Sequence, residues 1–152
     1  LKHWPIGADG FAAIEDGLAK TYRRGRTGLA AAREDPTDEA LHEWRKRVKY
    51  HRYQVRLLRS MWHGPMQARR RELRTLSDHL GDDHNLAIMR AALIDSPDEF
   101  GGAEVVGEMV SLIDRRRERL VAPALPLGEK LYAEKTKHFV RRFAACWAAW
   151  RE

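Results

Sequence analysis

A line of basic side chains between His42 and Arg59 is the part of this sequence best suited to chemistry with an anion. Its members recur at steps of three and four residues, the spacing that places side chains on one face of an α-helix. They are His42, Arg45, Lys49, Arg52, Arg56 and Arg59, with Lys46 and Tyr53 widening the line. No acidic residue occurs between Arg45 and Arg59, so we expect these cations to lack acidic partners within the helix.

Like charges stacked one turn apart repel each other, which favours an external anion as the partner of this line. Arg offers a planar fork to paired phosphate oxygens, and Lys offers a compact, mobile charge. His42 can donate a hydrogen bond to phosphate or to a neighbouring helix, and Tyr53 either donates its hydroxyl or packs at the edge. The alternative is a plain basic surface helix whose long stems cover the core.

An apolar line runs beside the basic one on the same predicted helix. Its members are Leu41, Trp44, Val48, Val55, Leu58 and Trp62, and His51 falls on the same face. This pattern predicts the buried face of a helix in a bundle. The basic line is centred roughly 120° away around the axis, so we expect it to flank a groove between helices.

Two further pairs of basic residues are secondary candidates for the same groove. Arg26 and Arg33 are seven residues apart on one predicted helix, and Lys135 and Arg142 are seven apart on another. Seven residues make about two turns, so each pair shares a face, although such pairs also occur at solvated bundle edges.

The Asp82-Asp83-His84 segment has side chains that can bind a metal. We favour a structural role in which Gly81 closes one helix and Asp83 caps the next. The sequence has no H-E-x-x-H motif, P-loop or glycine-rich dinucleotide turn. We therefore predict neither a metal centre nor a cofactor.

The elements that must hold these residues are long helices. Helical periodicity and Gly/Pro breaks predict helices over 8–34, 37–62, 66–80, 83–93, 103–121 and 127–150. Strand signals are lacking. We expect an all-α, antiparallel four-helix-bundle-like domain with long helices and one short extra helix, covering 8–152 as a single domain behind a tail at 1–7.

Composition narrows the classes of partner and location. The 152 residues carry a net charge of +6, which favours nucleic acid, polyphosphate or a lipid surface. The single cysteine, Cys146, excludes a disulfide framework and is typical of a reducing, cytoplasmic setting. No apolar run approaches the ~18 residues of a membrane span.

Three segments together resemble the CHAD family, the conserved histidine α-helical domain. The run H-x-x-R-K-x-x-K-x-x-R-Y spans His42 to Tyr53, Y-R-R-G-R spans Tyr22 to Arg26, and L-x-x-L-x-x-x-L-G-D-D-H-N-L spans Leu73 to Leu86. The resemblance implies two related four-helix halves around a basic cavity that binds inorganic polyphosphate, often fused to a CYTH triphosphate-processing domain. It implies that Arg45, Lys46, Lys49 and Arg52 contact phosphate, and it adds Tyr22 to the secondary candidates.

The chain departs from that family in two respects. It has one basic line and a length that suits one half, most like the second, so a homodimer or a missing half is expected to complete the domain. Asn85 stands where family members commonly have Asp.

Three functions follow in order of preference. The first is non-catalytic binding of polyphosphate for localisation or scaffolding, with association with polyphosphate granules. The second is nucleic-acid binding, with Tyr50 and Tyr53 as stacking groups. The third is an enzyme that uses His42 as a phosphoryl acceptor or as an acid/base. The sequence lacks the paired carboxylates or the group of metal ligands that such an enzyme would use.

Overall fold

The computed structural model describes residues 9–151, so the tail predicted at 1–7 lies outside the described residues. Within the described part the chain forms helices and no strand, which confirms the predicted all-α class. The helices are α1 (Ala12–Glu34), α2 (Asp38–Leu57), η1 (Arg59–Met61), α3 (His63–Asp95), η2 (Pro97–Phe100), α4 (Ala103–Leu131) and α5 (Thr136–Arg151), where η denotes a 3-10 helix.

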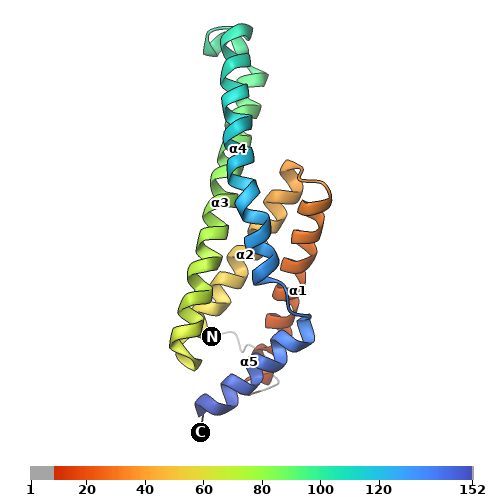
Figure 1. Ribbon diagram of the computed structural model, residues 1–152, viewed down its shortest axis with the longest axis vertical. Coiled ribbons are helices and arrows are strands. Elements are labelled where there is room, and N and C mark those ends of the chain that lie inside the picture. Colours follow the sequence, from red (N-terminus) through yellow and green to blue (C-terminus); the bar gives the residue numbers. More distant parts are fainter. Residues whose placement is uncertain (1–8, 152) are drawn as a thin grey trace, which may run out of the picture.

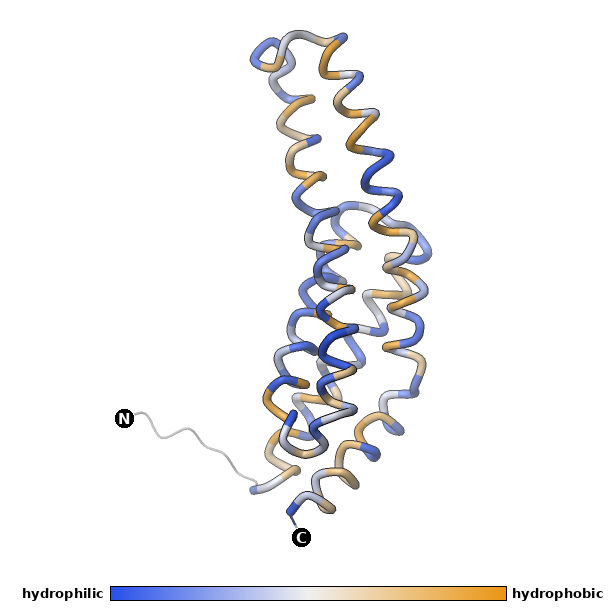
Figure 2. The backbone as a smooth tube through the Cα atoms, turned by 60° about the vertical axis from the view of Figure 1, so that its left-hand side comes forward, coloured by the Kyte–Doolittle hydropathy of each residue, from blue (hydrophilic) through white to orange (hydrophobic). Residues whose placement is uncertain are grey.

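The first four α-helices run antiparallel in chain order, and α2 lies between α1 and α3 (Figure 1). The lower part of α4 packs on α3 and reaches α1, while α5 lies across the lower end of α1. The upper parts of α3 and α4 rise beyond α1 and α2. We call residues 85–116 the arm; apolar residues continue along both of its helices (Figure 2).

The junction between α1 and α2 lies where the predicted helices 8–34 and 37–62 meet. Asp35 has an extended backbone and Pro36 cannot continue a helix, so α1 stops at Glu34. Thr37 then caps α2, because its hydroxyl accepts a hydrogen bond from the Ala40 amide at 3.2 Å.

The predicted apolar face of α2 is largely confirmed as the centre of the core. Leu41, Trp44, Val48, His51 and Val55 are buried. A Cβ added at Gly128 of α4 would overlap the Trp44 indole, and one added at Gly28 of α1 would lie 3.1 Å from the Trp44 Cα. Trp44 therefore packs against the backbones of two other helices.

Trp62 was wrongly assigned to that buried face. It is 55% exposed, because α2 ends at Leu57 and the chain turns through η1 before reaching it.

Gly81 does not end a helix, and the separate helix predicted at 83–93 is wrong. Residues 63–95 form one continuous helix, in which Gly81 has no positive φ and its helical backbone lies against Arg45. A glycine inside a helix costs about 1 kcal/mol. Burial of Leu76, Leu80 and Ala87 on both sides of it offsets that cost.

Asp83 is not a cap either. Its side chain is buried and accepts a hydrogen bond from Arg117 Nε of α4 at 2.8 Å.

Pro123 and Pro126 lie inside α4 and do not terminate it. Leu120, Ala124 and Leu131 stay buried on one face through this stretch, so packing offsets the missing backbone hydrogen bonds. The last helix begins at Thr136, and Lys135 therefore lies in the connection rather than on a shared helix face with Arg142.

We predict that Gly128→Ala will destabilise the protein by about 1–3 kcal/mol, because the new methyl group overlaps the fixed Trp44 ring. Gly17→Ala is the matched control: it lies within α1 with nothing within 4 Å of the added carbon, and it should stabilise the fold by roughly 0.5–1 kcal/mol. Urea denaturation measures both changes. A Gly128→Ala protein as stable as the wild type would contradict the packing described.

Candidate functional site

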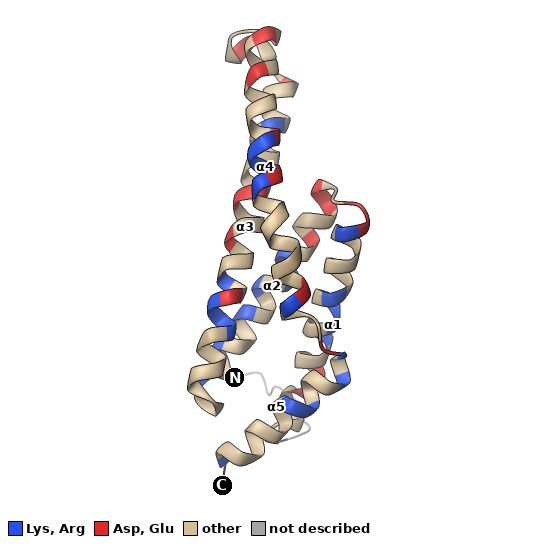
Figure 3. Ribbon diagram, in the orientation of Figure 1, with Lys and Arg blue, Asp and Glu red and all other residues tan. Residues whose placement is uncertain are grey.

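The outer faces of α2 and α3 border a groove with a volume of about 270 Å³. From α2 it is lined by three predicted residues, Arg52, Tyr53 and Arg56, and from α3 by Arg70, Arg74 and Asp78. Lys and Arg residues are frequent along the lower parts of both helices (Figure 3). We call the surface from His42 and His84 down to Arg56 and Arg70 the α2–α3 groove.

The α3 side of this groove was missed by the sequence interpretation. Its signal was the run Arg69-Arg70-Arg71 followed by Arg74. Arg70 and Arg74 are four residues apart and so share a helix face. Asp78 lies 3.6 Å from Arg74, which leaves the groove with more cations than anions.

The upper end of the groove contains two histidines and an arginine. The rings of His42 and His84 lie with their centroids 4.3 Å apart. Arg45 lies against Gly81 of α3. Nδ1 of His42 and Nε of Arg45 are both buried without a hydrogen-bond partner in the described structure. Burial is the main cause that lowers the pKa of His84, and electrostatic repulsion from His42 and Arg45 lowers it further.

The predicted lack of acidic partners on α2 is wrong for two of its cations. Glu43 pairs with Lys46 and also accepts a hydrogen bond from Arg47 at 3.0 Å. Glu43 lies just before the segment 45–59 that has no acidic residue. It reaches forward along the helix to the cations three and four residues later.

The remaining cations of the line fit the prediction. Within residues 9–151, Arg45, Lys49, Arg52 and Arg56 form no ion pair. The guanidinium carbons of Arg52 and Arg56 lie 5.4 and 5.9 Å from the Tyr53 ring centroid. Tyr53 thereby stabilises both guanidinium groups beside the groove.

The secondary candidates lie elsewhere. Arg26 and Arg33 line a separate groove of about 550 Å³ between α1 and the end of α4, where Arg33 pairs with Glu129 at 3.0 Å. Arg142 pairs with Glu134 at 2.6 Å, and Lys135 is exposed in the connection before α5.

Tyr22 is a buried core residue. Its ring stacks on Phe139 with centroids 3.8 Å apart, and its hydroxyl donates to the Glu134 carbonyl at 3.3 Å. It does not face the α2–α3 groove, because His51 and Tyr132 lie against it inside the core.

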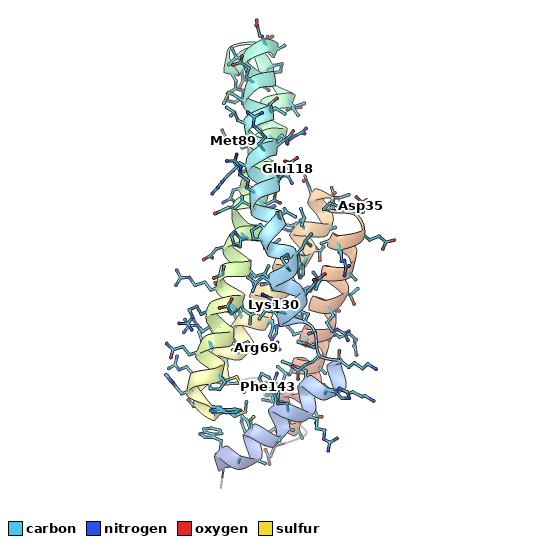
Figure 4. All side chains as sticks on the ribbon, viewed as in Figure 1. Asp35, Arg69, Met89, Glu118, Lys130 and Phe143 are labelled. Carbon is cyan, nitrogen blue, oxygen red and sulfur yellow. The ribbon has the colours of Figure 1, made fainter. Side chains whose placement is uncertain are left out.

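A polar cluster beneath the groove fixes the end of α4. Arg69 of α3 extends toward the lower end of α4 (Figure 4) and donates to the Leu131 carbonyl at 2.6 Å. It also reaches Nε2 of His51, whose Nδ1 lies 3.2 Å from the Tyr132 hydroxyl. Burial and the charge of Arg69 hold the pKa of His51 well below its ordinary value. His51 is thus a neutral core residue.

Among residues 9–151 no three His, Cys, Asp or Glu side chains converge in a way that could hold a metal ion. No helix of this part of the chain is apolar over the length needed to cross a bilayer.

Comparison with known proteins identifies a family model that matches the part of the chain forming this groove. A model described as "CHAD domain" matches residues 3–94, which cover α1, α2 and nearly all of α3. Neither the curated proteins nor the solved structures gave a match. The family match includes both walls of the groove and more than half of the chain, so the chain belongs to the CHAD domain family.

Proposed function

We propose that this chain is a non-catalytic module that binds inorganic polyphosphate along the α2–α3 groove. The observation that carries the proposal is the meeting of unpaired cations from α2 with Arg70 and Arg74 of α3 across one surface. The CHAD family binds polyphosphate, which agrees with this choice of polyanion.

The length of the groove suits a polymer better than a single phosphate. Arg45, Lys49, Arg52 and Arg56 follow one another at steps of four, three and four residues. At ~1.5 Å per residue they extend along about 16 Å of α2. A chain of linked phosphates can meet these donors in succession, with counterion release adding to the affinity.

The surroundings of His42 support binding rather than catalysis. A catalytic histidine is usually oriented by a hydrogen bond to a carboxylate or carbonyl. Nδ1 of His42 has no such partner among the described residues, and its ring neighbour is another histidine. With Nδ1 carrying the hydrogen, His42 has a free donor that suits an incoming phosphate oxygen, because that oxygen can only accept.

The wider role we propose is localisation or scaffolding. The module would hold its parent or partner protein at polyphosphate in the cytoplasm, including polyphosphate granules. A CYTH-type domain, fused or associated, is a partner that could act on the polymer held there.

Neutralising the α2 wall should weaken binding and reduce its salt dependence. We predict that Lys49→Gln with Arg52→Gln lowers affinity for labelled polyphosphate at least tenfold. The slope of log affinity against log salt should fall by about 0.7 for each phosphate that the variant no longer neutralises. Arg70→Gln with Arg74→Gln should act in the same direction. Fluorescence anisotropy at several salt concentrations measures both quantities.

The matched control is Lys20→Gln with Lys130→Gln, two exposed lysines outside the groove, which should bind almost as the wild type does. Unchanged binding by the Lys49/Arg52 variant would overturn the site. Equal competition by duplex DNA would mean a general polyanion binder, and phosphate release that depends on His42 would mean an enzyme.

Binding should strengthen as the pH falls. A bound polyanion favours protonated His84, whose pKa is lowered in the free protein, so binding takes up protons and affinity rises from pH 8 to pH 5.5. We expect a several-fold gain that His84→Asn removes. His138→Asn, an exposed histidine on α5, should keep the gain. A pH dependence untouched by His84→Asn would show that the histidine pair does not face the ligand.

A further inference from the structure

The outer part of the arm, residues 91–114, has the opposite charge to the rest of the chain. Residues 91–114 contain six acidic residues and no Lys or Arg, so the net charge of +6 combines −6 in this segment with +12 elsewhere. Asp and Glu residues lie at the upper end of the molecule, while Lys and Arg residues are frequent along the lower parts of α2 and α3 (Figure 3). The two charges are therefore separated along the long axis.

The acids of the arm are largely available to a partner. Asp114 pairs with Arg90 at 2.8 Å. The other five form no ion pair within residues 9–151, and all five are exposed: Asp95, Asp98, Glu99, Glu104 and Glu108.

One face of α4 in the arm is also apolar and uncovered. Val105 and Leu112 are 45% and 60% exposed, although Val106 and Ile113 beside them are buried against α3. Val105, Glu108 and Leu112 follow at steps of three and four residues, so they share one face, with Glu104 at its edge. We call these four residues (Glu104, Val105, Glu108 and Leu112) the arm stripe.

The outer face of α2 has matching features of opposite charge. Tyr50, Tyr53 and Leu57 are 51%, 41% and 75% exposed, and they too follow at steps of three and four residues. Lys49 and Arg56 flank them without an acidic partner among the described residues. This surface, the α2 stripe, presents three apolar groups and unpaired cations, while the arm stripe presents two apolar groups and unpaired anions.

We infer that the arm stripe of one copy docks on the α2 stripe of a second copy. The two stripes are far apart within one chain, because the arm rises beyond the start of α2 (Figure 1). If the two copies are related by a two-fold axis, the contact forms twice, once for each arm. Apolar burial supplies attraction at each contact, and the opposite charges fix its orientation.

The inference goes beyond the proposed function and has a consequence for it. Lys49, Tyr53 and Arg56 belong to both the α2 stripe and the α2–α3 groove. The acidic arm and polyphosphate therefore compete for one surface, so the polymer should dissociate the dimer. This consequence rests on the proposed function, whereas docking itself does not.

A charge-swap experiment tests the docking directly. Variant A carries Glu104→Lys and Glu108→Lys, and variant B carries Lys49→Glu and Arg56→Glu. Each variant repels itself at both contacts. A mixed pair of A with B has opposite charges at both contacts, because the basic arm of A meets the acidic α2 stripe of B and the unchanged acidic arm of B meets the unchanged α2 stripe of A. A control with Glu15→Lys and Glu72→Lys, exposed acids outside the arm, makes the same charge change as variant A.

Sedimentation at low salt measures the mass as concentration rises. Wild type and control should move from 17.6 kDa toward twice that mass, A and B alone should remain at 17.6 kDa, and the A–B mixture should approach the doubled mass. A wild type that stays monomeric, dimers of A or B alone, or a mixture that does not associate would each overturn the inference. Circular dichroism verifies that each variant is folded.

Polyphosphate titration separates this inference from the proposed function. Variant A leaves the groove intact and should bind polyphosphate at least as well as the wild type, since no arm competes. If neither the wild type nor variant A binds polyphosphate but the mass measurements behave as expected, the proposed function fails and the docking stands. If variant A binds the polymer but the wild type never dimerises, the docking fails and the proposed function stands.

Discussion

The close packing of Trp44 against the backbones of α1 and α4 is the contact on which the rest of the structure depends. Gly28 and Gly128 leave room for the indole, and no larger residue fits at Gly128 without a shift. This contact fixes the rotation of α2 about its axis. Arg45, Arg52 and Arg56 then border α3 rather than the core, so core packing offsets the repulsion among the cations of α2.

The rules that succeeded from sequence are those that depend on one helix at a time. The spacing of the apolar and basic lines predicted the buried face of α2, including His51, and the start predicted at residue 37 coincides with the Thr37 cap. The rules that failed were local rules overridden by packing. Gly81 and Pro123 are helix breakers in isolation, yet buried residues on either side keep α3 and α4 continuous.

Only the α2 wall of the candidate groove could be predicted from the sequence, because the position of the α3 wall depends on how the two helices pack against each other. Arg70 and Arg74 oppose Arg52 through the register of α2 against α3, and that register is set by contacts distant in sequence. Tyr22 lies in a motif rich in arginine, but only the tertiary structure reveals that its ring stacks on Phe139. Likewise, only the tertiary structure reveals that the acidic arm lies far from the basic groove.

Protection of individual lysines by polyphosphate tests the central claim most directly. An amine-reactive reagent, read by peptide mass spectrometry, reports the reactivity of each lysine with and without the polymer. The α2–α3 groove predicts that Lys46 and Lys49 lose reactivity several-fold, while Lys20, Lys130 and Lys137 stay as reactive as before. Lys49 remaining fully reactive at saturating polymer, or equal protection of all five lysines, would contradict the assignment of this groove.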